Sequence, residues 1–139
     1  MSVLLDTNIV SEMMKAAPNA EVLAFVSESR SAWISVITAH ELDYGVARLP
    51  TGRKRAILEA ALADLYMRYE DRILPVRYEE ARQAALLRAE AHERGRALHL
   101  ADALIAATAK AHGLTVATRN ISDFEDLGVH VIDPWTPGR

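Results

Sequence analysis

The stretch VLLDTN at residues 3–8 decides the fold that we predict for this chain. Three apolar residues run directly into a carboxylate and two short polar residues, which is how a buried parallel strand delivers an acid to the carboxyl edge of its sheet. An edge strand usually alternates apolar and polar residues, whereas a strand covered on both faces can be wholly apolar. We therefore expect this strand to be central. Thr7 and Asn8 then turn the chain and cap a helix from about Ile9.

Helical and strand patterns alternate along the rest of the chain. We expect strands at residues 33–36, 73–76, 114–118 and 129–132 and helices at residues 9–14, 20–29, 39–49, 51–69, 78–94 and 100–111, with a helical turn at 123–127. This alternation predicts an α/β fold with a parallel sheet of about four to five strands flanked by helices. We place a single domain at residues 1–133 and expect residues 134–139 to form a loosely held tail.

Composition narrows the class of protein. The 139 residues contain no cysteine, which excludes disulfides and any zinc site built on thiolates. The net charge of −3 argues against a polycationic protein that binds nucleic acid by charge alone. Of the 16 basic residues, 13 are Arg, which either suits contacts with phosphate or reflects codon bias. No segment reaches the roughly 20 apolar residues of a membrane span, and Met1 leads directly into a strand, so we expect a soluble, cytoplasmic protein.

Four acids lie at the predicted carboxyl ends of strands or on the helices that follow. Asp6 follows the first strand, Glu41 lies on the helix after the second, Asp102 lies in the first turn of an Ala-rich helix, and Asp123 follows the strand at 114–118. Such sheets bind ligands at this edge. Crowded carboxylates raise one another's pKa unless a cation neutralises them, and oxygen ligands alone suit Mg²⁺ or Mn²⁺.

Most of these acids also have a purely structural explanation. Asp6 can be a helix cap, and Glu41 can be the reciprocal partner of Thr38 in a capping box. Asp123 can be the N-cap of a short helix. Asp102 is harder to explain in this way, because its neighbours are apolar and an unpaired carboxylate there is costly. Three further acids are rivals: Asp43, Asp126 and Asp133.

Several other kinds of site lose support from the sequence. The five histidines show no HxxxH or HxH ligand spacing. There is no GxGxxG or GxxxxGK[ST] loop for a dinucleotide or nucleoside triphosphate, and no GxSxG elbow for an α/β-hydrolase. A phosphatase with an aspartyl nucleophile usually carries a second acid two residues on, where this chain has Asn8.

Four blocks of the sequence resemble a known family, the PIN domain. They are LLDTN at 4–8, SVITAHEL at 35–42, ADALIAATA at 101–109 and VATRNISDF at 116–124. More narrowly, the chain resembles the VapC-type toxins of bacterial type II toxin–antitoxin systems, including the FitB-like branch. Each block alone is weak evidence for the family. Four blocks in order at the right spacings, followed by DPW at 133–135, are highly specific for it.

The resemblance implies a Rossmann-like PIN domain and a Mg²⁺- or Mn²⁺-dependent endoribonuclease. Asp6, Glu41, Asp102 and Asp123 would be its catalytic and metal-binding acids. Because water rather than the ribose 2′-hydroxyl attacks, the products would carry a 5′-phosphate and a 3′-hydroxyl. Some relatives carry an acid at the position of Asn120. Candidate residues that orient the carboxylates or bound water are Thr7, Asn8, Ser35, Thr118 and Asn120.

The resemblance also implies partners. These are an RNA substrate, a second copy in a homodimer, and a small VapB-like antitoxin that places an Arg or Lys in the acidic pocket. Two alternatives stay open: a PIN-fold nuclease with a DNA or RNA-processing role, and a catalytically silent module that grips a basic partner. The sequence does not identify the RNA, and it displays no aromatic stacking platform.

Overall fold

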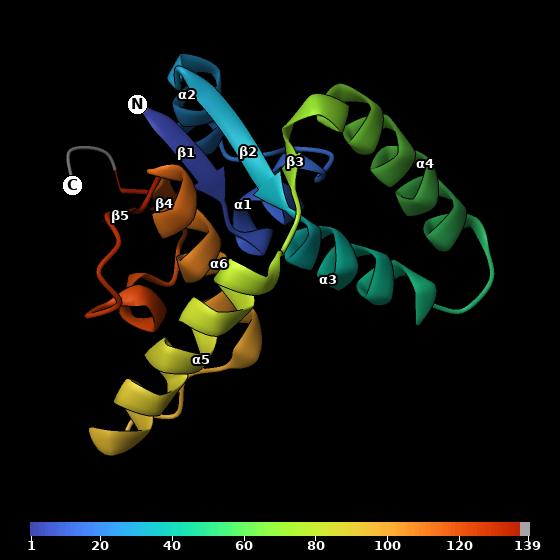
Figure 1. The fold of residues 1–139 in the computed structure, drawn as a ribbon. Coiled ribbons are helices and arrows are strands. Elements are labelled where there is room, and N and C mark those ends of the chain that lie inside the picture. Colours follow the sequence, from blue (N-terminus) through green and yellow to red (C-terminus); the bar gives the residue numbers. More distant parts are fainter. Residues whose placement is uncertain (137–139) are drawn as a thin grey trace.

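The computed structural model describes residues 1–136, in which helices and strands alternate along the chain (Figure 1). The elements are β1 (Ser2–Leu5), α1 (Thr7–Met13), α2 (Ala20–Glu28), β2 (Ser31–Ser35), α3 (Val36–Ala47), α4 (Arg53–Arg68), η1 (Glu70–Arg72), β3 (Ile73–Leu74), α5 (Tyr78–Glu93), α6 (Leu100–His112), β4 (Thr115–Ala117), η2 (Ile121–Phe124) and β5 (Val131–Ile132). Within residues 1–136, none of the helices is long and apolar enough to cross a membrane.

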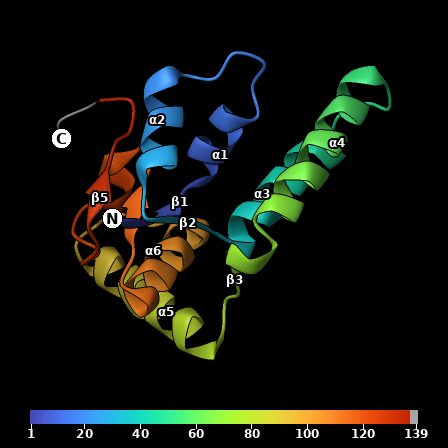
Figure 2. The same cartoon turned by 90° about the horizontal axis from the view of Figure 1, so that it is seen from above.

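The strands form one parallel sheet in the order β3-β2-β1-β4-β5. β1 is therefore central, as the apolar stretch predicts, and Leu4 is in register with Trp33 of β2 and Val116 of β4. Helices α1 and α2 cover one face of the sheet and α5 and α6 the other, while α3 and α4 project together to one side (Figure 2). The predicted α/β class and parallel sheet of about four to five strands are confirmed, and the sheet has five strands.

The two faces of β1 explain why its sequence is continuously apolar. Val3 and Leu5 are fully buried in the core that includes residues of α1 to α4. Leu4 is fully buried in the second core, which α5 and α6 dominate. A strand with both faces in a core has no solvent-facing positions, so no polar residue is needed before Asp6.

The start of α3 differs from the prediction. Ser35 is the N-cap, because its side-chain oxygen accepts a hydrogen bond from the Ile37 backbone N–H at 3.0 Å. Thr38 lies inside the helix and is fully buried, so the predicted capping box with Glu41 is wrong. The β-branched residues after Ser35 favour a strand locally, but the serine cap overrides that preference.

The start of α1 also lies earlier than expected. The helix begins at Thr7, and Asp6 is the N-cap, accepting a hydrogen bond from the Thr7 backbone N–H. The predicted cap by Thr7 and Asn8 is therefore wrong. Both residues instead lie in the first turn, which holds their side chains close to Asp6.

The chain after β5 is attached to the domain as far as it is described. Pro134 is buried, and Trp135 packs against the core that α1 and α2 share. The expectation of a loosely held tail is therefore wrong for residues 134–136. Its remaining part, residues 137–139, lies outside the described residues.

Candidate active site

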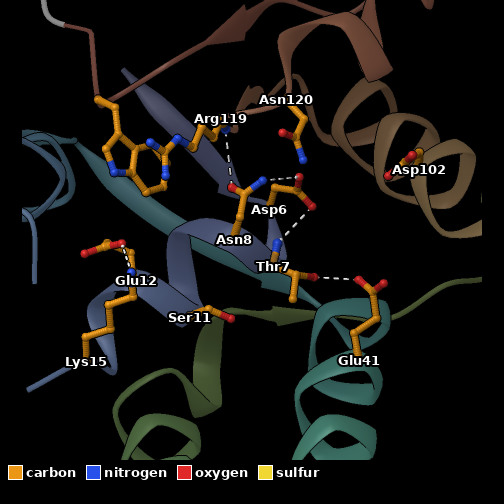
Figure 3. A pocket seen from close by; sticks show the side chains of 11 residues that line it. Asp6, Thr7, Asn8, Ser11, Glu12, Lys15, Glu41, Asp102, Arg119 and Asn120 are labelled. Atoms are coloured by element: carbon orange, nitrogen blue, oxygen red, sulfur yellow. Dashed lines mark hydrogen bonds and ion pairs between the residues drawn. The ribbon is translucent and has the colours of Figure 1, made fainter.

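Residues that follow β1, β2 and β4 line one pocket of about 470 Å³ (Figure 3). Asp6 lies directly after the central strand, Glu41 lies on α3 and Asp102 lies in the first turn of α6. The crossovers of a parallel sheet bring these positions together, although Asp6 and Asp102 are 96 positions apart in the sequence. Thr7, Asn8 and Asn120 also line the pocket.

Asp6 is the buried centre of this group, with 7% of its surface exposed. The Thr7 backbone N–H donates to Oδ1 at 2.8 Å, and the Thr118 hydroxyl donates to Oδ2 at 2.8 Å. The Asn8 side-chain amide donates to Oδ2 at 3.3 Å and to the Thr118 hydroxyl at 3.2 Å. These donors hold the carboxylate in one orientation. Asp6 is thus both a helix cap and a pocket residue.

Glu41 is held from the neighbouring helix. The Thr7 hydroxyl donates to Glu41 Oε1 at 2.5 Å, and it also lies 3.3 Å from the hydroxyl oxygen of the buried Thr38. Because Glu41 is in the second turn of α3, it does not cap that helix. Its carboxylate is instead tied to the residue that follows Asp6.

Two acids of the pocket, Asp6 and Asp102, have a raised pKa. Burial is the largest cause of the raised pKa of Asp6; the hydrogen bonds from Thr118 and Thr7 oppose it, and the charges of Glu41 and Asp123 add to it. Burial, followed by the charges of Asp6 and Asp123, raises the pKa of Asp102 to about 6, with a smaller increase from Glu41 and an opposing effect of His99. All four acids therefore act within one electrostatic environment.

Asp123 lies beside the pocket rather than in its lining. It is the third residue of the short 3-10 helix η2, so it is not the N-cap, and its side chain is exposed. Its charge nevertheless reaches both Asp6 and Asp102. The predicted helical turn at residues 123–127 begins two residues earlier in the structure, at Ile121.

The loop that carries Asp123 is held by Arg96. The guanidinium donates to the backbone oxygens of Asp123 at 2.6 Å, Ser122 at 3.0 Å and Glu125 at 2.6 Å. Arg96 is delivered there by the end of α5, where Gly95 has φ +74° and the Arg96 backbone N–H bonds to the Ala91 oxygen at 2.8 Å. This is a glycine-based helix end that reverses the chain direction.

The other predicted residues divide into two groups. Thr118 bonds to Asp6, and its hydroxyl oxygen also accepts from the Asn120 backbone N–H at 3.0 Å. Ser35 does not line the pocket and instead caps the helix that carries Glu41. The rival acids serve other contacts or turns: Asp43 accepts from the Tyr66 hydroxyl, Asp133 accepts from Trp135 and Thr136, and Asp126 is exposed at φ 63°.

A second side of the pocket was missed by the sequence analysis. It consists of Lys15, Arg119 and Trp135, together with Glu12, which is paired with Lys15. The guanidinium carbon of Arg119 lies 4.9 Å from the centroid of the Trp135 ring. No periodicity joins residues that far apart in sequence, although the position of Arg119 directly after a predicted strand was an available signal.

The donor set fits a hard divalent cation that keeps part of its water shell. The pocket acids offer only oxygen, and burial together with neighbouring carboxylate charges raises the pKa of Asp6 and Asp102. Within residues 1–136, no three carboxylate or histidine side chains stand close enough to ligate one ion directly. Hard divalent cations can bind through one or two carboxylates and retain several waters, which requires no such group of three.

Comparison with known proteins identifies the family. The model of the PIN domain matches residues 3–129. The chain belongs to the PIN-domain family. "VapC ribonuclease Y4jK" of Sinorhizobium fredii is 40% identical over 97% of this chain and 99% of its own length. "Toxin FitB" of Neisseria gonorrhoeae is 39% identical over 96% of this chain and 98% of its own.

Solved structures agree on this PIN-domain fold. The crystal structure of FitAcB from Neisseria gonorrhoeae matches with a TM-score of 0.87 and 39% identity, covering 97% of this chain and 99% of that chain. VapBC-5 from Mycobacterium tuberculosis, described as a member of the VapBC family of toxin–antitoxin systems, matches with a TM-score of 0.70 and 28% identity over 94% of this chain and 95% of that one. The predicted resemblance to PIN-domain toxins is confirmed.

The bond between Thr7 and Glu41 gives a first prediction. Thr7→Val removes the hydroxyl that holds Glu41 Oε1 but keeps the shape of the side chain. We expect RNA cleavage to fall roughly tenfold to a hundredfold, the usual range when a residue that orients a ligand is lost. Initial rates on a labelled RNA measure the effect. Thr7→Ser, which keeps the hydroxyl, is the matched control, and equal rates for Thr7→Val and the parent protein would contradict the role.

Proposed function

We propose that this chain is the toxin of a type II toxin–antitoxin system and acts as a metal-dependent endoribonuclease. The observation that carries the proposal is the pocket in which Asp6, Glu41 and Asp102 meet from three separate elements, with the pKa of Asp102 raised to about 6. The names of its relatives, a VapC ribonuclease and a FitB toxin, support the same activity. If all three acids had only structural roles, their carboxylates would not need to share one pocket.

Asp6 and Asp102 are the residues that we propose to hold Mg²⁺, with Mn²⁺ as a substitute, and Glu41 and Asp123 complete its surroundings. When bound, such an ion lowers the pKa of a coordinated water and offsets charge that builds on a phosphate. The hydrogen bonds from Thr7, Asn8 and Thr118 fix the Asp6 carboxylate before any ion arrives. A preoriented carboxylate avoids reorganisation when the ion binds.

The acids also decide where the RNA phosphate can lie. Without a cation, the carboxylates of Asp6, Glu41 and Asp102 repel a phosphate, so productive binding depends on the divalent ion. Water as the nucleophile leaves a 5′-phosphate and a 3′-hydroxyl. A 2′,3′-cyclic phosphate at the cut ends would exclude this mechanism.

The proposed partners follow from the relatives. Structures similar to this one are VapBC and FitAB assemblies, including complexes with DNA. For this chain we propose a homodimer and a VapB-like antitoxin that inserts an Arg or Lys among the pocket carboxylates. A side-chain cation there satisfies the same oxygens as a metal ion. Cleavage of cellular RNA by such a toxin takes place in the cytoplasm.

The test is cleavage of total cellular RNA by the purified protein with Mg²⁺, with Mn²⁺ or with a chelator, followed by mapping of new 5′ ends. We expect discrete cuts that require the ion and are absent with Asp102→Asn. Cuts that survive this substitution would indicate a contaminating nuclease. Absence of RNA cuts together with cleavage of DNA would favour the DNA nuclease, and no metal binding at all would favour the silent module.

Competition between antitoxin and metal gives a second prediction. If an antitoxin Arg or Lys occupies the carboxylates, raising Mg²⁺ should weaken antitoxin binding in proportion to the occupancy of the site. Titration of the antitoxin by calorimetry at several Mg²⁺ concentrations measures this. The same titration with Asp102→Asn should lose most of its dependence on Mg²⁺. Antitoxin affinity that is independent of Mg²⁺ in the parent protein would contradict an inserted cation.

A further inference from the structure

The pocket has a cationic side opposite its acids. In Figure 3, Lys15 and the side chain of Arg119 extend to the left of Asp6, whereas Asp102 and Glu41 lie to its right. From this separation of charge, we propose that Arg119, supported by the ring of Trp135, is the binding site for an RNA phosphate next to the one that is cut. This inference rests on the proposed ribonuclease activity and adds a positioning residue for its substrate.

Trp135 is fixed by the turn that follows β5. The Asp133 carboxylate accepts a hydrogen bond from the Trp135 backbone N–H at 2.8 Å and another from the Thr136 hydroxyl at 3.2 Å. The indole ring is partly buried against the core shared by α1 and α2. A ring held at both its backbone and its packed edge is a rigid support.

Arg119 is fixed at its backbone and along its side chain. Its backbone N–H donates to Asn8 Oδ1 at 3.3 Å, and the Asn8 amide bonds in turn to Asp6. Its guanidinium carbon lies 4.9 Å from the Trp135 ring centroid. A guanidinium on an aromatic face keeps its N–H groups available for forked contacts with phosphate. A single side chain, Asn8, therefore links the proposed phosphate contact to the central carboxylate.

The charges around Arg119 leave it able to accept an anion. Lys15 pairs with Glu12 at 2.8 Å, and Glu12 also accepts from the Asn19 backbone N–H at 2.9 Å. Within residues 1–136, no carboxylate lies within ion-pair distance of Arg119. This side of the pocket thus carries two cations against one carboxylate, while the other side carries acids alone. RNA should therefore lie with the cut phosphate at the acids and its neighbour at Arg119.

The alternative explanation is a purely structural role, in which the Arg119–Trp135 contact only holds residues 133–136 against the domain. The two roles differ in their dependence on salt. Each phosphate neutralised by a cation adds about one to the slope of log affinity against log salt concentration. If the contact is only structural, its removal lowers thermal stability and leaves the salt slope of RNA binding unaltered.

The experiment measures binding of a fluorescein-labelled, single-stranded 12-residue RNA of mixed sequence by anisotropy, with Mg²⁺ present and Asp102→Asn in every protein to prevent cutting. Adding Arg119→Ala should weaken binding roughly tenfold to a hundredfold, as for loss of a charged hydrogen bond, and should lower the salt slope by about one. Adding Arg119→Lys should restore the slope but only part of the affinity, because the planar stacked group is lost.

Two further variants separate the contributions. Adding Trp135→Ala should weaken binding about threefold to tenfold without changing the salt slope, because the charge stays while its support is lost. Adding Arg30→Ala removes an exposed Arg that precedes β2, at the opposite edge of the sheet, and should change neither quantity.

The outcomes distinguish this inference from the proposed function. RNA binding with an unchanged affinity and slope in Arg119→Ala would overturn the phosphate site and leave the ribonuclease proposal standing. Equal losses in Arg119→Ala and Arg30→Ala would also overturn it, because they would reflect net charge alone. No RNA binding by the Asp102→Asn protein, combined with no cleavage by the parent, would overturn both.

Discussion

Asp102→Asn should unfold at a higher temperature than the parent protein when metal is absent, although it removes a residue that we propose for catalysis. The carboxylate is about half-buried beside other acids, and its pKa is raised from the ordinary 3.8 to about 6. An amide of the same shape removes this repulsion. Functional sites often store such instability, which is released when the function is destroyed.

The pH dependence of this gain follows from the direction of the shift. The folded protein holds the Asp102 proton more tightly than the unfolded chain, so folding loses free energy as the pH rises from about 4 to about 7. A shift of about two pKa units corresponds to roughly 3 kcal/mol, but partial exposure of Asp102 reduces the expected gain to about 1 kcal/mol. Asp102→Asn should therefore be stabilised by roughly 4 °C at pH 7 to 8 and by almost nothing at pH 4.

Thermal unfolding at pH 4, 6 and 8 with a chelator measures this prediction, and Asp71→Asn is the matched control. Asp71 is exposed in η1, outside the pocket, so its amide should show no such gain. Adding Mg²⁺ should stabilise the parent more than Asp102→Asn and narrow or reverse the difference. A parent protein that is more stable than Asp102→Asn at pH 8 without metal would contradict the electrostatic argument.

The parts of the fold that were predictable depend on local patterns with one physical solution. The apolar run before Asp6 could be satisfied only by a strand covered on both faces, and β1 is central. Asp102 was the acid hardest to explain by structure alone, because an ionised carboxylate within an apolar helix has few structural uses. Its position in the first turn of α6 and in the pocket agrees with that reasoning.

The start of α3 was not predictable in the same way. Residues after Ser35 are β-branched and suit a strand, whereas two serine or threonine residues could each cap the following helix. Local sequence does not decide between Ser35 and Thr38. The choice is made by tertiary structure, in which Thr38 is fully buried beside Thr7.

The cationic side of the pocket was invisible for a different reason. Arg119 and Trp135 follow separate strands, β4 and β5, and meet only because those strands are neighbours in the sheet. The sequence displays no clustered aromatic and basic residues, so it predicts no aromatic support for nucleic acid. A platform built from two strand ends has no signature along the chain.

Arg96→Ala should lower RNA cleavage roughly tenfold to a hundredfold, although Arg96 does not line the pocket. Its guanidinium is bonded to three backbone oxygens of the segment that includes Asp123, and removal of those bonds lets this segment move. The charge of Asp123 acts on both Asp6 and Asp102, so displacement of the segment changes the surroundings of the proposed ion. The Mg²⁺ concentration for half-maximal rate should rise. Arg94→Ala, which removes an exposed neighbouring charge, is the matched control.

Arg96 acts as a positioning residue only if its effect passes through Asp123, and a double-mutant cycle tests that condition. In an Asp123→Asn background, Arg96→Ala should cause little further loss of cleavage, because the carboxylate that it positions is already gone. If Arg96→Ala acted only by disturbing the structure, its fold-loss of cleavage would instead multiply with that of Asp123→Asn. The Mg²⁺ concentration for half-maximal rate would then stay unchanged. Arg96→Lys, which keeps the charge but not the forked contacts to several oxygens, should recover only part of the rate.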